Sequence, residues 1–130
     1  MFEAINPDTV VGPVSNYSNG LVVPAGRMLH ISGQVGVDAA LVFAEGVEAQ
    51  TRLAFENIRR IVEAAGGSMD DVVSITLYLK DIGDAKAVSG IRSEIFARPP
   101  FPASTMIGHC GFIMPQILVE ISAIAAPPSR

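Results

Sequence analysis

The sequence predicts an α+β protein in which a mixed β-sheet carries two helices packed on one face. Three observations indicate this fold class: short runs that alternate apolar and polar residues, two longer stretches with helical apolar spacing, and single glycines and prolines between them. The predicted order is strand, strand, helix, strand, helix, strand, strand, which a two-layer domain accommodates. With 130 residues, the chain is expected to form a single domain over residues 1–130.

The first strands come before residue 34. Residues 21–23 have strand composition, and residues 24–26 (Pro-Ala-Gly) then turn the chain. Residues 27–33 form the second predicted strand, which is expected to close at Gly33. We therefore expect a turn at Gly33, although a glycine in a strand also allows a ligand to approach the backbone closely.

Residues 47–65 form the clearest predicted helix. Apolar residues recur there at spacings of three, four and seven, which gives one apolar stripe. The polar side offers two i,i+4 ion pairs, Glu56–Arg60 and Arg59–Glu63. The glycines that follow residue 65 provide the left-handed stop.

The second half of the chain predicts one helix and three strands. Residues 72–80 alternate strictly, as a half-buried strand does. Asp84 is the expected N-cap of a second helix, which must end near Arg98 because two prolines follow. Residues 103–110 and 116–125 complete the set of strands.

Two helices can cover only one face of this sheet. Only 17% of the residues are charged, while 49% are hydrophobic, so the surface has few charges to cover a second face. We therefore expect the open face to be buried by self-association.

Composition also excludes several classes of function. A net charge of −4 disfavours binding to nucleic acid through phosphate neutralisation. A single cysteine excludes an intrachain disulfide framework and a multi-cysteine zinc site. The N-terminal residues lack the pattern of a signal peptide, and the longest charge-free run, residues 99–119, contains four prolines. We expect a soluble cytoplasmic protein without a membrane span.

Glu120 is the most informative position for function. It lies in the apolar strand 116–125 and shares a face with Leu118, Ser122 and Ile124. A carboxylate there suits a general acid or base, or a group that orients water in a cleft. The alternative is a structural carboxylate that reaches solvent or a basic group of a partner subunit.

Other reactive residues give weaker signals. His109 and Cys110 suggest nucleophilic catalysis, but adjacent strand residues point to opposite faces. A metal site would also need Glu120 and His30, and the spacing does not support one. Tyr17 lies in a polar loop, where it either caps a pocket or leans on the surface.

Several short motifs occur in a fixed order along the chain. They are Ile31-Ser32-Gly33-Gln34, Ala49-Gln50-Thr51 with Asn57-Ile58, Ile61-Val62-Glu63-Ala64-Ala65-Gly66, Leu79-Lys80-Asp81, Phe101-Pro102-Ala103, and Val119-Glu120-Ile121 with Ala123-Ile124-Ala125. Together they resemble the RidA/YjgF superfamily, whose older names are endoribonuclease L-PSP and translation initiation inhibitor. The resemblance extends from about residue 16 to residue 125.

The resemblance implies a fold like that of bacterial chorismate mutase. It also implies a homotrimer whose sheets line a central β-barrel, with a small-molecule ligand in each cleft between subunits. The best-known members hydrolyse reactive enamines and imines, such as 2-aminoacrylate, to 2-keto acids and ammonia without a cofactor. Glu120, Tyr17 and Gly33 match cleft positions of this family.

Three cleft positions depart from the deaminase pattern. Those enzymes have the motif Pro-Ala-Arg-Ser, in which the arginine binds the substrate carboxylate, whereas Ser104 stands in its place here. Met106 replaces a cysteine, and Ser89 aligns with an asparagine. The chain thus resembles an arginine-lacking branch, and Arg27 or Arg98 of a neighbouring subunit is an alternative source of positive charge.

Two functional hypotheses follow. In the first, the trimer hydrolyses a small imine, enamine or related electrophile: Glu120 orients or deprotonates water, backbone groups near Gly33 and Ser104 hold the polar end, and Tyr17 closes the cleft. In the second, the cleft binds a neutral or weakly polar metabolite without turnover, as a regulatory module. Ribonuclease activity is the weakest interpretation, because the chain is acidic and has no evident pair of catalytic bases.

Overall fold

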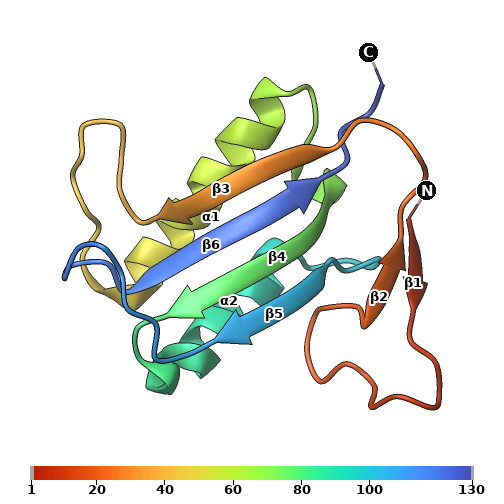
Figure 1. Ribbon diagram of the computed structural model, residues 1–130, viewed down its shortest axis with the longest axis horizontal. Helices are drawn as coiled ribbons and strands as arrows, with labels where there is room; N and C mark the ends of the chain where they lie inside the picture. The colour runs from red at the N-terminus through yellow and green to blue at the C-terminus, as the bar shows by residue number, and fades with distance from the viewer. Residues whose placement is uncertain (1, 130) are drawn as a thin grey trace.

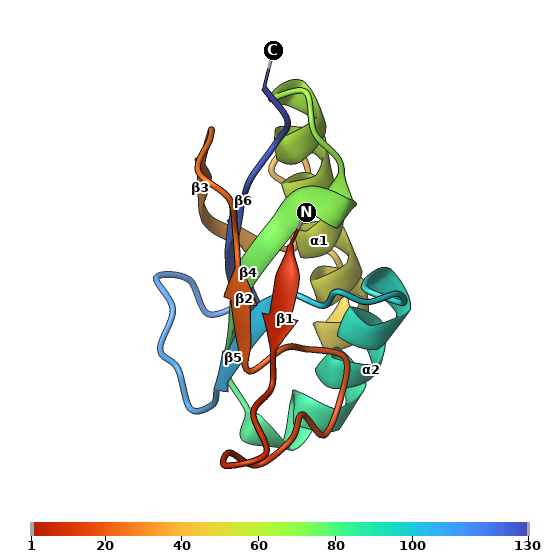
Figure 2. The same ribbon diagram turned by 90° about the vertical axis from the view of Figure 1, so that its right-hand side faces the viewer.

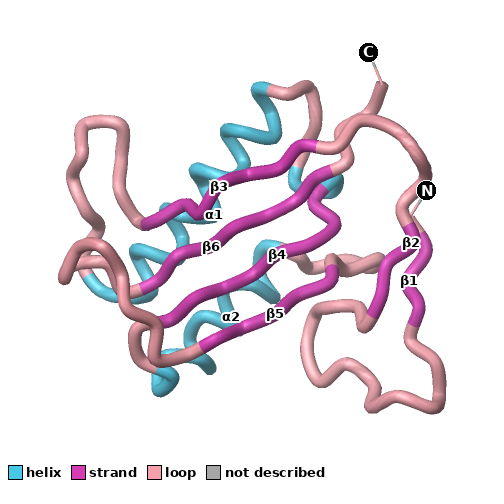
Figure 3. The backbone as a smooth tube through the Cα atoms, viewed as in Figure 1, coloured by secondary structure: helices cyan, strands magenta, loops and turns pink. Residues whose placement is uncertain are grey.

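A computed structural model describes residues 2–129 of the chain. Its main sheet has the strand order β3-β6-β4-β5, and Figures 1 and 3 show these strands side by side. The four strands are β3 (Leu29–Val35), β4 (Val72–Leu79), β5 (Ala103–Ile107) and β6 (Val119–Ala125). β6 pairs antiparallel with β3 and β4, whereas β4 and β5 are parallel, so the sheet is mixed as predicted.

Two helices cover one face of this sheet. They are α1 (Gly46–Ala64) and α2 (Ala85–Ile95), and a short 3₁₀ turn precedes each of β4 and α2, at Met69–Asp71 (η1) and Ile82–Asp84 (η2). Figure 2 shows both helices on the same side, while the loop between β5 and β6 bends outward on the other side. The predicted α+β class is confirmed. Among residues 2–129, no helix is long and apolar enough to cross a membrane.

The hydrophobic core lies between the helices and the sheet. Alternate residues of β4 and β6 point toward the helices and are almost fully buried, as the alternation of the sequence predicts. Phe55 of α1 meets Phe96 edge to face, with ring centroids 5.9 Å apart. The largest fully buried side chains are Phe55, Ile58, Ile75, Leu77, Leu79, Ile121, Val62, Val88, Val119 and Thr51.

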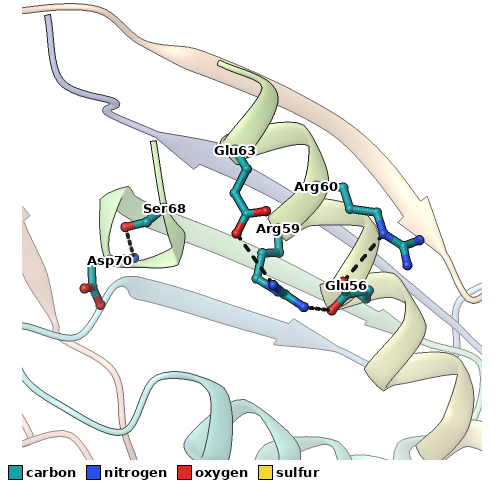
Figure 4. A network of polar contacts seen from close by, with 6 residues as sticks. All are labelled: Glu56, Arg59, Arg60, Glu63, Ser68 and Asp70. Carbon is teal, nitrogen blue, oxygen red and sulfur yellow. Dashed lines mark hydrogen bonds and ion pairs between the residues drawn. The ribbon is translucent and has the colours of Figure 1, made fainter. Parts of the chain in front are cut away.

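Helix α1 agrees closely with its prediction. It ends at Ala64 with Ala65 as its C-cap, and Gly66 follows with a φ of +88° that provides the left-handed stop. On its solvent side, Figure 4 shows Arg59 and Arg60 paired with Glu56, and Arg59 also paired with Glu63. Both predicted i,i+4 pairs form, each with an N–O distance of 3.5 Å. Because these side chains are largely solvated, each pair contributes only a few tenths of a kcal/mol.

The strand ends differ from their predictions. β3 does not close at Gly33 but continues to Val35, because a bulge between Ile31 and Gln34 lets the strand keep pairing with β6. The interpretation of Gly33 as a turn is therefore wrong. β5 ends at Ile107 rather than at residue 110, and His109 has a left-handed φ of +59° that a strand does not tolerate.

The N-terminal segment adds a two-stranded antiparallel sheet, of which the sequence predicts one strand. β1 (Glu3–Ile5) pairs antiparallel with β2 (Gly20–Val22) beside the main sheet. The sequence predicts only β2, since β1 is short and exposed, without an apolar alternation. The chain between them carries Tyr17 to the edge of the main sheet, where the Ser18 N–H donates to the Pro102 carbonyl at 3.0 Å.

Gln50 of α1 fixes the segment that leads into β6. Its buried amide donates to the carbonyls of Ala44, at 3.1 Å, and Gln116, at 2.8 Å. Its carbonyl oxygen accepts the Leu118 N–H at 2.9 Å. These bonds hold the backbone two residues before Glu120, and so help to define where β6 begins.

Candidate active site

Glu120 lies on the open face of the sheet. Its neighbours in the chain, Val119 and Ile121, are fully buried beneath the helices, so the alternation of β6 turns Glu120 to the opposite side. The carboxylate is half-buried, and it forms neither a hydrogen bond nor an ion pair with any of residues 2–129. The predicted orientation is therefore observed, and the carboxylate is free to act on water or a ligand.

Gly33 provides the space in which this carboxylate lies. A Cβ atom at position 33 would lie 2.1 Å from Oε2 of Glu120, which is closer than any real contact. Because β3 and β6 are neighbours, any side chain at position 33 would push the Glu120 carboxylate away from this place. Glycine at position 33 therefore allows the Glu120 carboxylate to lie where it does.

A second polar group surrounds Arg92 of α2. Arg92 is only 6% exposed. Its Nη1 donates to Ser104 Oγ of β5 and its Nη2 donates to Ser89 Oγ of α2, both at 2.9 Å. The guanidinium carbon lies 5.6 Å from the centre of the Tyr17 ring, within the range of a cation–π contact. We call Arg92, Ser89, Ser104 and Tyr17 the arginine cluster.

Arg92 keeps its positive charge although it is buried. Burial lowers the pKa of the Arg92 guanidinium from its ordinary value, and the attraction to Tyr17 acts in the opposite direction. An arginine starts from so high a pKa that it keeps its charge at neutral pH. The cluster is therefore a positively charged site.

The structure brings three predicted residues together in the arginine cluster, namely Tyr17, Ser89 and Ser104. Arg92 itself was not predicted. It is four residues after Val88, on the apolar stripe of α2, and a charged residue on such a stripe was the available signal. The positive charge expected from the sequence was Arg27 or Arg98 of a neighbouring subunit, and neither belongs to the arginine cluster.

The arginine cluster and Glu120 lie on opposite faces of the sheet. Ser104 is in register with Ile75 of β4, which points into the core beneath the helices. Glu120 is in register with Tyr78 of β4, which points to the open face. The cluster also lies at the β5 edge, whereas Glu120 lies next to β3. One copy of the chain therefore does not bring the two groups together.

Met106 and Cys110, two further residues singled out in the sequence, belong neither to the arginine cluster nor to the surroundings of Glu120. Met106 follows Ser104 on the same face of β5 and packs against the core. Cys110 is a free thiol in the loop after β5, and its Sγ contacts the Ile107 carbonyl oxygen at 3.5 Å. Within residues 2–129, no group of three or more His, Cys, Asp or Glu side chains is placed to hold a metal ion.

A cavity of about 720 Å³ lies away from both polar groups, among the loop of residues 23–27, η1 and the segment that follows α2. Arg27 and Arg98 line it. Arg27 donates to the Pro128 carbonyl at 3.0 Å, and Arg98 pairs with Asp70 at 3.7 Å while more than four-fifths exposed. Because the half-buried Arg27 is already bonded to a carbonyl and the exposed Arg98 is already paired with a carboxylate, this cavity is a weaker candidate site than the arginine cluster.

The comparisons with known proteins agree with this architecture. The family model described as endoribonuclease L-PSP matches residues 8–127. A RutC family protein of Saccharolobus solfataricus is 36% identical over 127 residues, which are 96% of this chain and 98% of that protein. The Rid family protein YyfB of Yersinia pestis has a TM-score of 0.87 and 28% identity, covering 96% of this chain and 98% of its own.

RidA from an Antarctic Psychrobacter species is a further solved relative. It is 34% identical with a TM-score of 0.68, and the likeness covers 95% of this chain and 98% of that one. A mixed sheet with two helices on one face thus places the molecule among the Rid-type α+β proteins. The chain belongs to the endoribonuclease L-PSP family, which is the RidA/YjgF superfamily that its motifs resemble.

Proposed function

We propose that this protein is a homotrimer that hydrolyses a small reactive imine, enamine or related electrophile, without a cofactor, in clefts between its subunits. Water adds to the C=N carbon, and the carbinolamine that forms loses ammonia to leave a carbonyl product. Glu120 passes both protons of the water to the nitrogen in turn, the first as the water oxygen adds to carbon and the second, from the carbinolamine hydroxyl, as the C–N bond breaks. The whole chain acts as one RidA-like domain in the cytoplasm, and the lack of a disulfide partner for Cys110 agrees with that compartment.

One observation carries this proposal: the free, half-buried carboxylate of Glu120. Carboxylates in apolar strands are rare unless they are paired, and this one has no partner among residues 2–129. A general base must be within hydrogen-bonding reach of the water it activates, and a carboxylate already held by a protein cation would be a poorer base. Gly33 leaves the space beside it open.

The separation of the two polar groups supports a cleft between subunits. Glu120 lies on the open sheet face, and the arginine cluster lies at the β5 edge on the other side. A second copy packed against the open face could bring its own β5 edge toward Glu120. In an assembly of this kind, Glu120 of one chain and the arginine cluster of another would together form one site.

The test measures imine hydrolysis directly. An amino-acid oxidase generates the imine, and the release of keto acid is followed with and without the protein. We expect acceleration by the wild type and none by Glu120→Gln, since the amide keeps the shape of the side chain but cannot accept the proton. Glu48→Gln, an exposed carboxylate of α1, is the matched control and should keep full activity.

Two results would contradict the proposal. Full activity of Glu120→Gln with an unchanged assembly would remove Glu120 from the mechanism. A wild type that binds small carbonyl compounds but accelerates no imine hydrolysis would favour a binding or regulatory protein instead. Ribonuclease activity, which the family description names, has little support here because the net charge of −4 provides no basic face for RNA.

A further inference from the structure

The Arg92 guanidinium is a buried cation for which the described chain supplies no anion. Arg92 is 6% exposed, and it forms no ion pair with any of residues 2–129. Its Nε has no hydrogen-bond partner in this part of the chain. Burial of an unpaired charge is costly, and proteins normally pair a buried arginine with a carboxylate or another anion. The missing partner is the feature that needs an explanation.

The surrounding hydroxyl groups orient the guanidinium without neutralising it. Ser104 and Ser89 each accept one hydrogen bond from it, and Ser15 Oγ contacts Ser89 Oγ at 3.4 Å and Ser93 Oγ at 3.2 Å. A serine that accepts a hydrogen bond from arginine keeps its own O–H proton available for an acceptor. Arg92 Nη1 and Nη2 each retain a second N–H as well. The cluster therefore presents several donors and no acceptor with a negative charge.

The cluster lies just below the surface at the edge of the sheet. Tyr17, Ser89 and Ser104 are only half-buried, although the guanidinium they contact is buried. Ser104 belongs to β5, which is the edge strand. A small ligand at this edge would meet the half-buried Ser104 hydroxyl, and the guanidinium of Arg92 lies directly behind that hydroxyl, with Nη1 2.9 Å from its oxygen.

We propose that Arg92 binds the carboxylate of a small organic acid, with Ser104 and Ser89 holding the guanidinium in place. Arg92 of α2 thus places its positive charge beside Ser104 of the edge strand β5. This inference rests on the proposed function for the reaction, and it narrows the substrates to imines and enamines that carry a carboxylate. One guanidinium balances one carboxylate, whereas a phosphate dianion would need further positive charge.

The test measures binding rather than turnover. Pyruvate and its neutral amide, pyruvamide, have the same shape and differ in charge, and calorimetry gives the Kd of each for the assembled protein. We expect the wild type to prefer pyruvate, and Arg92→Gln to weaken pyruvate binding about 10- to 100-fold without affecting pyruvamide. Arg98→Gln, which removes an exposed arginine, should leave both Kd values unchanged.

A rescue variant guards against a purely structural effect. Because Ser104 Oγ lies 2.9 Å from Nη1 of Arg92, the double variant Arg92→Gln with Ser104→Arg returns a guanidinium to the same region. We expect it to regain the preference for pyruvate, whereas a general defect in folding would not be rescued.

The inference and the proposed function fail in different ways. Pyruvate binding that persists in Arg92→Gln, or inorganic phosphate that binds as tightly as pyruvate, would overturn the assignment of Arg92. Charge-dependent binding through Arg92 in a protein without imine hydrolysis would instead uphold the assignment and overturn the proposed reaction.

Discussion

Glu120 and Arg92 carry opposite charges, and neither is neutralised by the part of the chain that the structure describes. An unpaired charged group in an apolar setting lowers the stability of the fold unless something outside the chain compensates it. A protein retains such a group where the ligand or the reaction supplies the missing partner. At the scale of residues, the unpaired charges are therefore the clearest evidence for function in this molecule.

The contact of Gly33 with Glu120 gives a prediction at this scale. Gly33→Ala would place a Cβ 2.1 Å from Oε2 of Glu120, and the end of that flexible side chain would move aside. We expect the rate of imine hydrolysis to fall about 10- to 100-fold, because a displacement of about 1 Å misplaces the base. The thermal midpoint should change little, since no backbone atom has to move.

Gly26→Ala is the control for that measurement, because a Cβ there would meet nothing within 4 Å. Equal activity of Gly33→Ala and the wild type would show that the position of Glu120 is not critical. Unfolding of Gly33→Ala would instead show that the glycine is required by the bulge of β3.

At the scale of elements, regular periodicity made the fold predictable. The apolar stripe of α1 and the alternation of β4 and β6 gave these elements to within three residues at either end. The ends of β3 and β5 were less predictable, since a bulge and a left-handed His109 depend on neighbouring strands. Glu120 was found because a charge interrupts an apolar strand. Arg92 was missed because basic residues in amphipathic helices are usually solvated.

The hydrogen bonds of Gln50, which hold the segment before β6 against α1, give a prediction about stability. Gln50→Leu keeps the volume but removes three hydrogen bonds to Ala44, Gln116 and Leu118. We expect the free energy of unfolding to fall by about 1–3 kcal/mol, because backbone groups near the start of β6 lose their partners. Chemical denaturation measures this change. Gln116→Leu, at an exposed position of the same segment, should be nearly neutral, and an equal loss in both variants would contradict the role of Gln50.

At the scale of the whole molecule, the open sheet face is the feature that the chain alone does not explain. Residues of β4 and β6 on this face, including Thr76, Ser122 and Ile124, are half-buried within the sheet. Figure 2 shows α1 and α2 on the opposite side of the sheet. Two-layer α+β folds bury one sheet face and solvate the other, and the second face is then rich in charge. Here Glu120 is the charged residue of β4 and β6 on that face, which favours contact with further copies of the chain.

Thr76→Arg tests this assembly. Thr76 lies in the middle of the open face, in register with Thr105 on one side and Ser122 on the other. A guanidinium there would have to be desolvated in the proposed trimer, at a cost of several kcal/mol per subunit. We expect light scattering to report three times the mass of one chain for the wild type, and a single chain for Thr76→Arg. Imine hydrolysis should be lost with the trimer, because Glu120 and the arginine cluster then stay on separate faces.

Ala49→Arg adds the same charge at an exposed position of α1, on the helical side of the molecule, and should leave both the mass and the activity unchanged. A monomeric wild type with full activity would contradict the shared site, since a single chain would then complete the reaction. A Thr76→Arg trimer would show that the subunits meet elsewhere. Loss of activity in a folded Thr76→Arg monomer would instead mean that Glu120 of one subunit and Arg92 of another form a single site, which exists only where two copies meet.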